Sequence, residues 1–408
     1  MAQSFSPKNY FKKIYSHEVL TEFYKRHEIT AIFEIVESTP RKNIVGMFMD
    51  FYNSLSIEQK FEIEKELALV NSISTKYSPA LFSSLLKEKK IAEEKQIECT
   101  SDHDGALYHY MFNRELFDEV LFFHDFYSSR GYMLYEAKEV PLADADFAST
   151  ELMREFIRIA NKEDNATECD FVHKTLDGLL YLTMTFDGAS ILTAKRDSAT
   201  GEIDKTSTTR RNEVVKIVYL PSDKEVLISY TGGKYEKLIF LDTFLRIVCK
   251  SGYEGKVESF NLSSFKDETF DFTKTNKGVQ LLTWKIKSAT LSFGNEKTKK
   301  RMKLTLPSSV QEYGLTPLHG TLDELGISKQ LQEYSVENVT LSFSFTNSQK
   351  PDKSLQAQCS ISLTKSSLCP LFPYDRMART LLKLAHIEQG FVEPAKKEKD
   401  DVAKKWEV

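Results

Sequence analysis

Cysteine is scarce in this sequence of 408 residues, and its five copies lie far apart. An odd number of distant thiols does not indicate a disulfide framework, and without a C-x-x-C pair no structural zinc site is predicted. The five residues are Cys99, Cys169, Cys249, Cys359 and Cys369. We therefore expect a fold held together by its apolar core, with no metal ion and no cofactor.

Long apolar runs are also missing. The chain nowhere contains the ~18 or more consecutive apolar residues that a membrane span needs, and the opening MAQSFSPKNYFKK lacks the apolar segment of a secretion signal. The formal net charge is only −4, from 55 basic and 59 acidic residues, so no overall attraction to nucleic acid or to an anionic membrane follows. These absences predict a cytoplasmic protein without membrane contacts, whose partners recognise local surfaces.

The common catalytic motifs are absent as well. The sequence has no Walker A motif, no G-x-G-x-x-G, no G-x-S-x-G, and no kinase or deaminase motif. Because no convergent catalytic set is visible, we favour a protein that is not an enzyme.

Helical periodicity is what the first part of the chain does contain. A helix is predicted over 42–55, and Ser56 with Gln59 three residues later forms a capping-box sequence for the next helix. The stretch 99–138 is the richest in aromatic residues. Its Tyr and Phe side chains could form a stacking surface for bases or a small ligand, but their spacing of three and four residues favours the apolar stripe of one core helix.

Beyond residue 170 the pattern changes to the period of two that is typical of strands. Asp187-Gly188 predicts a tight hairpin turn, with 189–194 as the returning strand. The clearest unit, 213–250, alternates through a hairpin and then changes to helical spacing after a diglycine. This unit predicts two paired strands followed by a helix.

A second β-rich series begins near residue 281, where Leu282, Trp284 and Ile286 alternate as core-facing residues of a strand would. Further alternating runs follow, with a short helix predicted over 321–334 and a closing helix over 375–387. The series therefore has the same order of elements as the first.

These patterns predict an α+β fold: a helical N-terminal domain followed by a β-rich body of antiparallel hairpins with packed helices. Two β-β-β-β-α units are one open interpretation of the body. The predicted divisions are a mainly helical domain at 1–150, hairpin and helix units at 151–280 and 281–392, and a charged tail at 393–408 that we expect to be disordered.

One weak catalytic pattern is Asp125 followed by Glu136-Ala137-Lys138. An acid on one element and E-x-K on a strand is how metal-dependent nucleases hold Mg²⁺ and orient the attacking water. The pattern is short, and a chain with 28% charged residues produces it by chance. A metal-dependent nuclease is therefore kept as one alternative.

A second candidate is Asp102-His103-Asp104, with His109 nearby, because imidazole and carboxylate groups suit a divalent ion. Polar residues at the start of a helix explain the same residues as capping groups that follow Ser101. No later motif supplies further ligands, so we favour capping.

Two basic clusters lie in polar connections between predicted strands. Lysine and arginine in such loops serve solubility, but two clusters on one face could also contact a phosphate backbone. Nucleic-acid binding through these loops is therefore the second functional hypothesis. The clusters are Lys195, Arg196, Lys205, Arg210 and Arg211, and Lys297, Lys299, Lys300, Arg301 and Lys303.

Three segments of the β-rich half resemble uncharacterised bacterial proteins of about this length: EVVKIVYLPSDKEVLISYTGGKYEKLIFLDTFLRIV, FNLSSFKDETFDF and SLCPLFPYDRMARTLL. The opening PKNYFKKIYSHEVLTEFYKR resembles them as well. These proteins have no named family and no assigned activity, so the resemblance implies no site residue. Our first functional hypothesis is a non-enzymatic binding or adaptor protein of a bacterial cytoplasmic assembly, in phage defence or regulation, with a protein partner.

Overall fold

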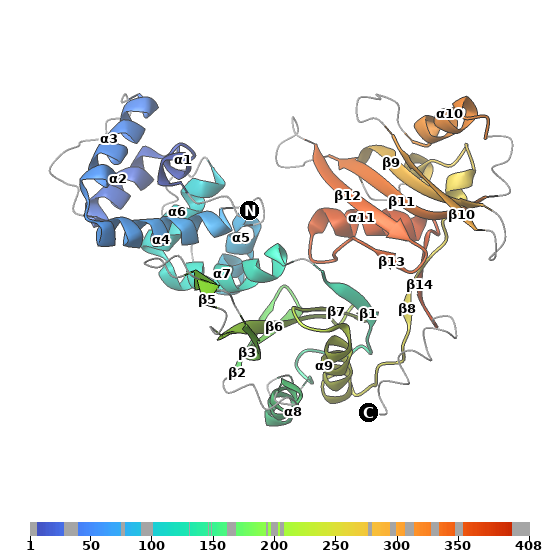
Figure 1. Cartoon of the computed structure of the whole chain (residues 1–408), viewed down its shortest axis with the longest axis horizontal. Coiled ribbons are helices and arrows are strands. Elements are labelled where there is room, and N and C mark those ends of the chain that lie inside the picture. Colours follow the sequence, from blue (N-terminus) through green and yellow to red (C-terminus); the bar gives the residue numbers. More distant parts are fainter. Residues whose placement is uncertain are drawn as a thin grey trace. The chain divides into compact units, whose positions relative to one another are not determined.

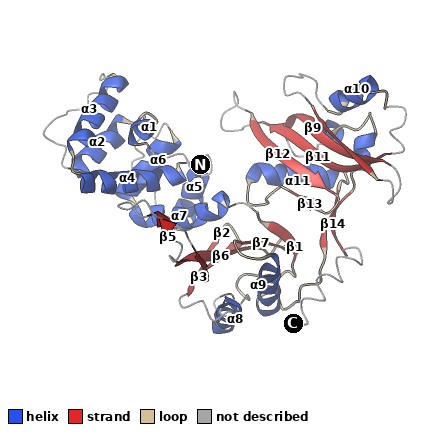
Figure 2. Cartoon of the chain, in the orientation of Figure 1, coloured by secondary structure: helices blue, strands red, loops and turns tan. Residues whose placement is uncertain are grey.

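The fold is known from a computed structural model in which two compact units are distinguished, residues 1–130 with 174–181 and residues 131–173 with 182–408. Helices dominate the first unit, and β-sheets with flanking helices make up the second (Figure 1, Figure 2). The predicted α+β fold is therefore confirmed. The structure describes residues 6–27, 40–74, 78–90, 101–129, 131–145, 147, 149–160, 169–192, 195–196, 203–204, 208–275, 280–293, 299–306, 314–327, 334–346 and 354–393.

A capping box starts the longest helix of the first unit, α4 (Ile57–Ile73). The Ser56 hydroxyl accepts from the N–H of Gln59 at 3.3 Å, and the Gln59 side chain accepts from the N–H of Ser56 at 3.1 Å. The predicted capping box is therefore confirmed. The other described helices of this unit are α1 (Pro7–Phe11), α2 (His17–Arg26), α3 (Arg41–Ser54), α5 (Ser78–Glu88), α6 (Asp102–Phe112) and α7 (Arg114–Ser128).

The aromatic stretch forms two helices, α6 and α7, and the prediction of one continuous helix is wrong. The break lies at Asn113, whose φ of −135° ends one helix and precedes the next. Asparagine favours such ends because its short amide competes with the backbone hydrogen bonds of a helix. Of the residues predicted for the apolar stripe, Leu116, Val120 and Phe123 of α7 are buried, whereas Phe112 is 47% exposed.

The first sheet of the second unit has the strand order β1-β7-β6-β3-β2. Figure 2 shows α8 (Thr150–Ala160) and α9 (Lys234–Ile247) on the same side of this sheet. The helices meet through Phe156 and Phe240, whose ring centroids are 5.1 Å apart, and Phe240 contacts Tyr230 of the sheet at 5.5 Å. The strands are β1 (Met133–Glu136), β2 (Cys169–Leu176), β3 (Leu179–Leu192), β6 (Thr208–Leu220) and β7 (Glu225–Tyr230).

The hairpin turn between β2 and β3 lies at Asp177-Gly178, and the predicted turn at Asp187-Gly188 is wrong. Asp177 and Gly178 have φ angles of 51° and 75°, the left-handed pair that a two-residue hairpin turn needs. β3 runs on through Asp187 and Gly188, so the described part of the predicted return strand is the last part of β3. Both dipeptides are Asp-Gly, and only the strand pairing distinguishes them.

The compact units divide after Arg130, whereas the predicted domains divide at residue 150. β1 lies before residue 150 but pairs with β7, so it belongs to the first sheet. The tip of the β2–β3 hairpin belongs to the helical unit, because Tyr181 packs edge-on against Phe123 and Phe126 of α7 at 5.0 and 5.2 Å. Both assignments depend on long-range pairing, which local sequence patterns do not show.

The second sheet has the strand order β10-β9-β11-β12-β13. Its buried face shares one apolar core with α10 (Thr316–Glu324) and α11 (Pro373–Leu384), to which these helices contribute Leu318 and Leu381. The strands are β9 (Leu281–Phe293), β10 (Lys300–Thr305), β11 (Tyr334–Phe345), β12 (Leu355–Ser362) and β13 (Lys365–Ser366).

The two sheets share the chain order of two hairpins and a helix but differ in topology. In the first, β2, β3, β6 and β7 follow one another across the sheet. In the second, β9 pairs with both β10 and β11, and α10 lies in the connection between β10 and β11. Each series therefore has two hairpins and a closing helix, but α10 interrupts the second, and the strand order across the two sheets is not the same.

Two details of the second series differ from the sequence prediction. Leu282 is 52% exposed, and Leu281 lies in the core instead, because the ladder between β9 and β11 shifts by one residue there. The short helix begins at Thr316, before the predicted range 321–334, with Pro317 in its first turn, where proline is tolerated.

Smaller elements complete the second unit. β8 pairs with β14 as an antiparallel ribbon, and β4 pairs with β5. Within the residues described, no helix is both long enough and apolar enough to cross a membrane. The bounds are β4 (Lys195–Arg196), β5 (Ile203–Asp204), β8 (Val257–Phe260), β14 (Glu388–Val392), and the 3₁₀ turns η3 (Ser263–Lys266) and η4 (Phe272–Thr275).

Candidate nucleic-acid interface

The second sheet has a polar face opposite its core. Trp284, Ile286 and Leu291 of β9 lie in the core shared with α10 and α11, so the residues between them point the other way. The same alternation holds on the neighbouring strands. We call this polar side the outer face, and its main residues are Lys285, Lys287, Ser288, Thr290, Ser292, Arg301, Lys303, Thr305, Glu337, Asn338, Thr340, Ser342, Ser344, Gln356, Gln358 and Ser360.

Two β-bulges add charged residues to the outer face. In the β9–β11 ladder Thr340 pairs with Ser288 but the next residue of β11 pairs with Ile286, so Lys287 has no opposite residue. Glu337 of β11 is skipped in the same way. A bulge places the extra residue and its neighbour on about the same side of the sheet. Lys287 and Ser288 therefore both lie on the outer face, and the alternation resumes beyond the bulge with Ala289 and Leu291 in the core.

Long side chains lie flat across the strands of the outer face. The Lys287 ammonium donates to the Gln358 amide oxygen at 3.0 Å, which spans β11 and leaves Ser342 only 9% exposed. Arg301 Nε lies 2.7 Å from a Glu337 carboxylate oxygen, and Lys299 pairs with the same carboxylate. Burial acts to raise the pKa of Glu337, but the hydrogen bonds and charges of Lys299 and Arg301 outweigh it, so this pKa lies below its usual range.

The other described lysines of this region differ from Lys299 in that no described carboxylate pairs with them. Among the described residues, Lys285, Lys300 and Lys303 have no ion-pair partner, and Lys287 is bonded only to a neutral amide. In the strand ladders Lys285 lies opposite Ser342 and Lys303 opposite Thr290. Ammonium groups beside hydroxyl donors are the combination that binds phosphate oxygens. The outer face therefore carries groups of the kind that bind phosphate oxygens.

The described residues do not test whether the two predicted basic clusters lie side by side, so this stays a prediction. Lys195 and Arg196 form β4, and Arg210 and Arg211 lie in β6, but the orientation of these side chains is outside the described structure. Lys205 and Lys297 also lie outside the described residues. Of the second cluster, Arg301 and Lys303 lie on the outer face, together with Lys285 and Lys287, which the sequence analysis missed. Their signal was present, since Lys285 and Lys287 alternate with the core residues Trp284 and Ile286. Only that alternation assigns them to the outer face.

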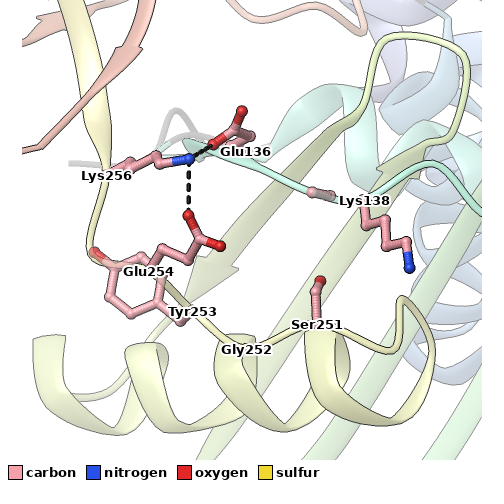
Figure 3. Close-up of a pocket in the computed structure, with 8 residues that line it drawn as sticks. Glu136, Lys138, Ser251, Gly252, Tyr253, Glu254 and Lys256 are labelled. Atoms are coloured by element: carbon pink, nitrogen blue, oxygen red, sulfur yellow. Dashed lines mark hydrogen bonds and ion pairs between the residues drawn. The ribbon is translucent and has the colours of Figure 1, made fainter.

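Glu136 and Lys138 line a different site, a cavity of about 240 Å³ between the end of β1 and residues 251–256 (Figure 3). The Lys256 ammonium lies 2.8 Å from Glu136 and 2.7 Å from Glu254, and hydrogen bonds to both carboxylates raise the pKa of Lys256. Figure 3 shows the Lys138 side chain directed away from Glu136. The carboxylate of the E-x-K pattern is therefore neutralised by Lys256, and not arranged with Lys138 around a metal position.

Asp125 lies on α7 and lines a cavity of about 560 Å³ built by the helical unit, together with Asp118, His124 and Ser72. Burial lowers the pKa of His124, against the opposing charge of Asp125. Within the described ranges, no group of three or more His, Cys, Asp or Glu side chains could hold a metal ion. The nuclease interpretation of Asp125, Glu136 and Lys138 remains a prediction, and unchanged cleavage by the Glu136→Ala variant would remove it.

The Asp102-His103-Asp104 pattern has a structural role. The Asp104 carboxylate is fully buried and accepts from the N–H groups of Tyr15 at 2.7 Å and Ser16 at 3.0 Å, while Ser101 caps α6 by accepting from the N–H of Asp104. His109 stacks on Phe82 at 4.1 Å, and burial lowers its pKa to about 4, so it is neutral. The capping interpretation is therefore confirmed.

No protein-family model matches the chain, and a search of curated proteins found no match either. The assignment of a function therefore depends on the geometry of the sites themselves.

Proposed function

We propose that this chain is a non-enzymatic binding protein whose outer face holds the sugar-phosphate backbone of a nucleic acid. The observation that supports this most directly is the set of lysines, Lys285, Lys287 and Lys303, spread over β9 and β10 among serine and threonine hydroxyls without a carboxylate partner among the described residues. Lysine binds phosphate as a point charge, so the face would not demand a fixed orientation of the strand.

The chemistry of the outer face suits backbone contacts more than base recognition. Its main residues include no aromatic side chain on which a base could stack. Three lysine–phosphate contacts give a slope of about −2 to −3 for log K against log salt, and binding of this kind has a Kd of about 10⁻⁴–10⁻⁶ M at physiological salt. We therefore expect weak, salt-sensitive binding without sequence preference.

Removing the three lysines tests this proposal. We expect the triple variant Lys285→Gln, Lys287→Gln, Lys303→Gln to weaken binding of a labelled oligonucleotide by about tenfold or more at low salt and to reduce the salt slope by about 2–3. Fluorescence anisotropy between about 50 and 200 mM salt measures both quantities, with single-stranded and double-stranded probes.

A matched control removes the same charge elsewhere. Lys12, Lys250 and Lys274 are exposed and do not belong to the outer face, so their replacement by glutamine lowers the net charge equally. The control variant should bind as the unmodified chain does. Equal losses in both variants, or no salt-sensitive binding by the unmodified chain, would contradict the proposal.

For the wider role of the chain we keep the first functional hypothesis. We propose that it is a cytoplasmic binding or adaptor component of a bacterial assembly in phage defence or regulation, with a protein partner. A pull-down from the native host, with bound protein and nucleic acid both identified, tests this role. Recovery of the chain alone would count against it.

A further inference from the structure

A buried cluster of charges joins four elements of the second unit. Arg379 of α11 is 7% exposed, and its Nε lies 3.0 Å from both carboxylate oxygens of Glu388 in β14. Its Nη1 donates to Glu225 at the start of β7, and its Nη2 lies 4.0 Å from Glu258 in β8. Glu225 and Glu388 are buried as well. One guanidinium therefore links β7 to the β8–β14 ribbon.

The charges in this cluster do not balance when every group is ionised. Three carboxylates face one guanidinium, and the only other cation that the described residues place here is Lys383, half exposed at the rim, 3.7 Å from Glu388 and 3.9 Å from Glu225. Lys256, two residues before Glu258, is paired with Glu136 and Glu254 instead. A buried site with one unmatched negative charge is unfavourable because its charges have lost their hydration.

Glu258 is the carboxylate that can take up a proton. Glu225 and Glu388 are hydrogen-bonded to Arg379, whereas Glu258 lies beyond hydrogen-bond distance from it. Burial raises the pKa of Glu258 to about 7; Arg379 and the Ser366 backbone oppose this shift, and Glu388 and Glu225 add to it. With Glu258 neutral, Arg379 and Lys383 balance Glu225 and Glu388.

We propose that this cluster is a proton-operated latch, in which protonation of Glu258 fastens the β8–β14 ribbon to β7 through Arg379 and ionisation of Glu258 loosens it. The direction follows from linkage, because a carboxyl group that binds its proton more tightly in the folded chain stabilises the fold at low pH. The stabilisation of the fold by protonated Glu258 is complete below pH 4.5, the ordinary pKa of Glu. It is lost as the pH rises through about 7, the pKa of Glu258 in the folded chain. The latch is independent of the proposed nucleic-acid binding.

Hydrogen exchange of the full chain, followed by mass spectrometry, tests the latch. After correction for the intrinsic pH dependence of exchange, we expect the opening constant of peptides covering 257–260 and 388–392 to rise by up to about tenfold per pH unit between pH 5 and 7 and to level off above that. Peptides from α8, which contains no histidine and no member of the cluster, should show no such change.

The variants Glu258→Gln and Glu254→Gln separate the latch from a general effect of pH. Glutamine at 258 mimics the protonated group, so its ribbon peptides should stay protected at every pH. Glu254→Gln removes a nearby exposed carboxylate and should keep the pH dependence of the unmodified chain. The latch is overturned if Glu258→Gln keeps that dependence too, or if the ribbon peptides of the unmodified chain respond no differently from the peptides of α8.

Discussion

Replacing Arg379 by methionine should destabilise the second unit by about 3–5 kcal/mol, the usual effect of removing one partner from a buried ion pair. Methionine fills much of the same volume but leaves Glu225 and Glu388 buried without their donor. Arg379 lies in α11 next to Ala378, which packs in the same core as Trp284. Urea unfolding followed by tryptophan fluorescence therefore reports the change, since Trp284 is 2% exposed.

The matched control for this variant is Lys383→Met, one turn further along α11. The Lys383 side chain is 52% exposed, and a surface ion pair contributes only about 0–1 kcal/mol. The loss of unfolding free energy in the Arg379 variant, which we call its deficit, should also be smaller at low pH. The carboxylates that the substitution leaves unpaired take up protons there. A deficit below about 1 kcal/mol, or one that is the same at pH 5 and pH 8, would mean that the cluster is solvated and not buried.

Replacing Asp104 by alanine should destabilise the helical unit by about 2–4 kcal/mol, because one buried and one partly buried N–H group lose their acceptor. The bonds to Tyr15 and Ser16 hold the chain just before α2 against the first turn of α6. Asparagine at position 104 keeps an oxygen that both N–H groups can reach, so it should cost less than alanine. Urea unfolding followed by circular dichroism at the helical band measures the change in the free energy of unfolding.

Asp102 provides the control for this substitution. It is a carboxylate in the same first turn of α6, but it is exposed. Its replacement by alanine removes only a favourable charge near the helix N-terminus, which is worth about 0.3–1 kcal/mol. Equal effects of Asp102→Ala and Asp104→Ala would show that the bonds to Tyr15 and Ser16 do not stabilise this unit.

The sequence was sufficient to predict the helices and hairpins that are determined by residues close together in the chain. Ser56 and Gln59 cap α4 through contacts three residues apart, and the hairpin and helix of 213–250 appear as β6, β7 and α9. Asn113 shows the limit, since the aromatic periodicity continues through it while the helix does not.

Pairing between distant strands decided the features that the sequence did not show. Asp177-Gly178 and Asp187-Gly188 are equally good turn sequences, and only the partner of β3 selects the first. The exposed position of Leu282 follows from a register shift against β11, which no property of β9 alone predicts. The outer face has the same origin, because Lys303 joins the lysines of β9 on one face only after β10 has paired with β9.

The difference in strand order between the two sheets has a consequence for the speed of folding. β6 and β7 are joined by a four-residue turn, so the centre of the first sheet forms from neighbours in the chain and closes a short loop. The pairing of β9 with β11 instead closes a loop that contains β10, α10 and their connections. Closing the longer loop costs more chain entropy before any contact offsets it. The second sheet, and with it the outer face, should therefore be the slower part of the second unit to form after dilution from denaturant.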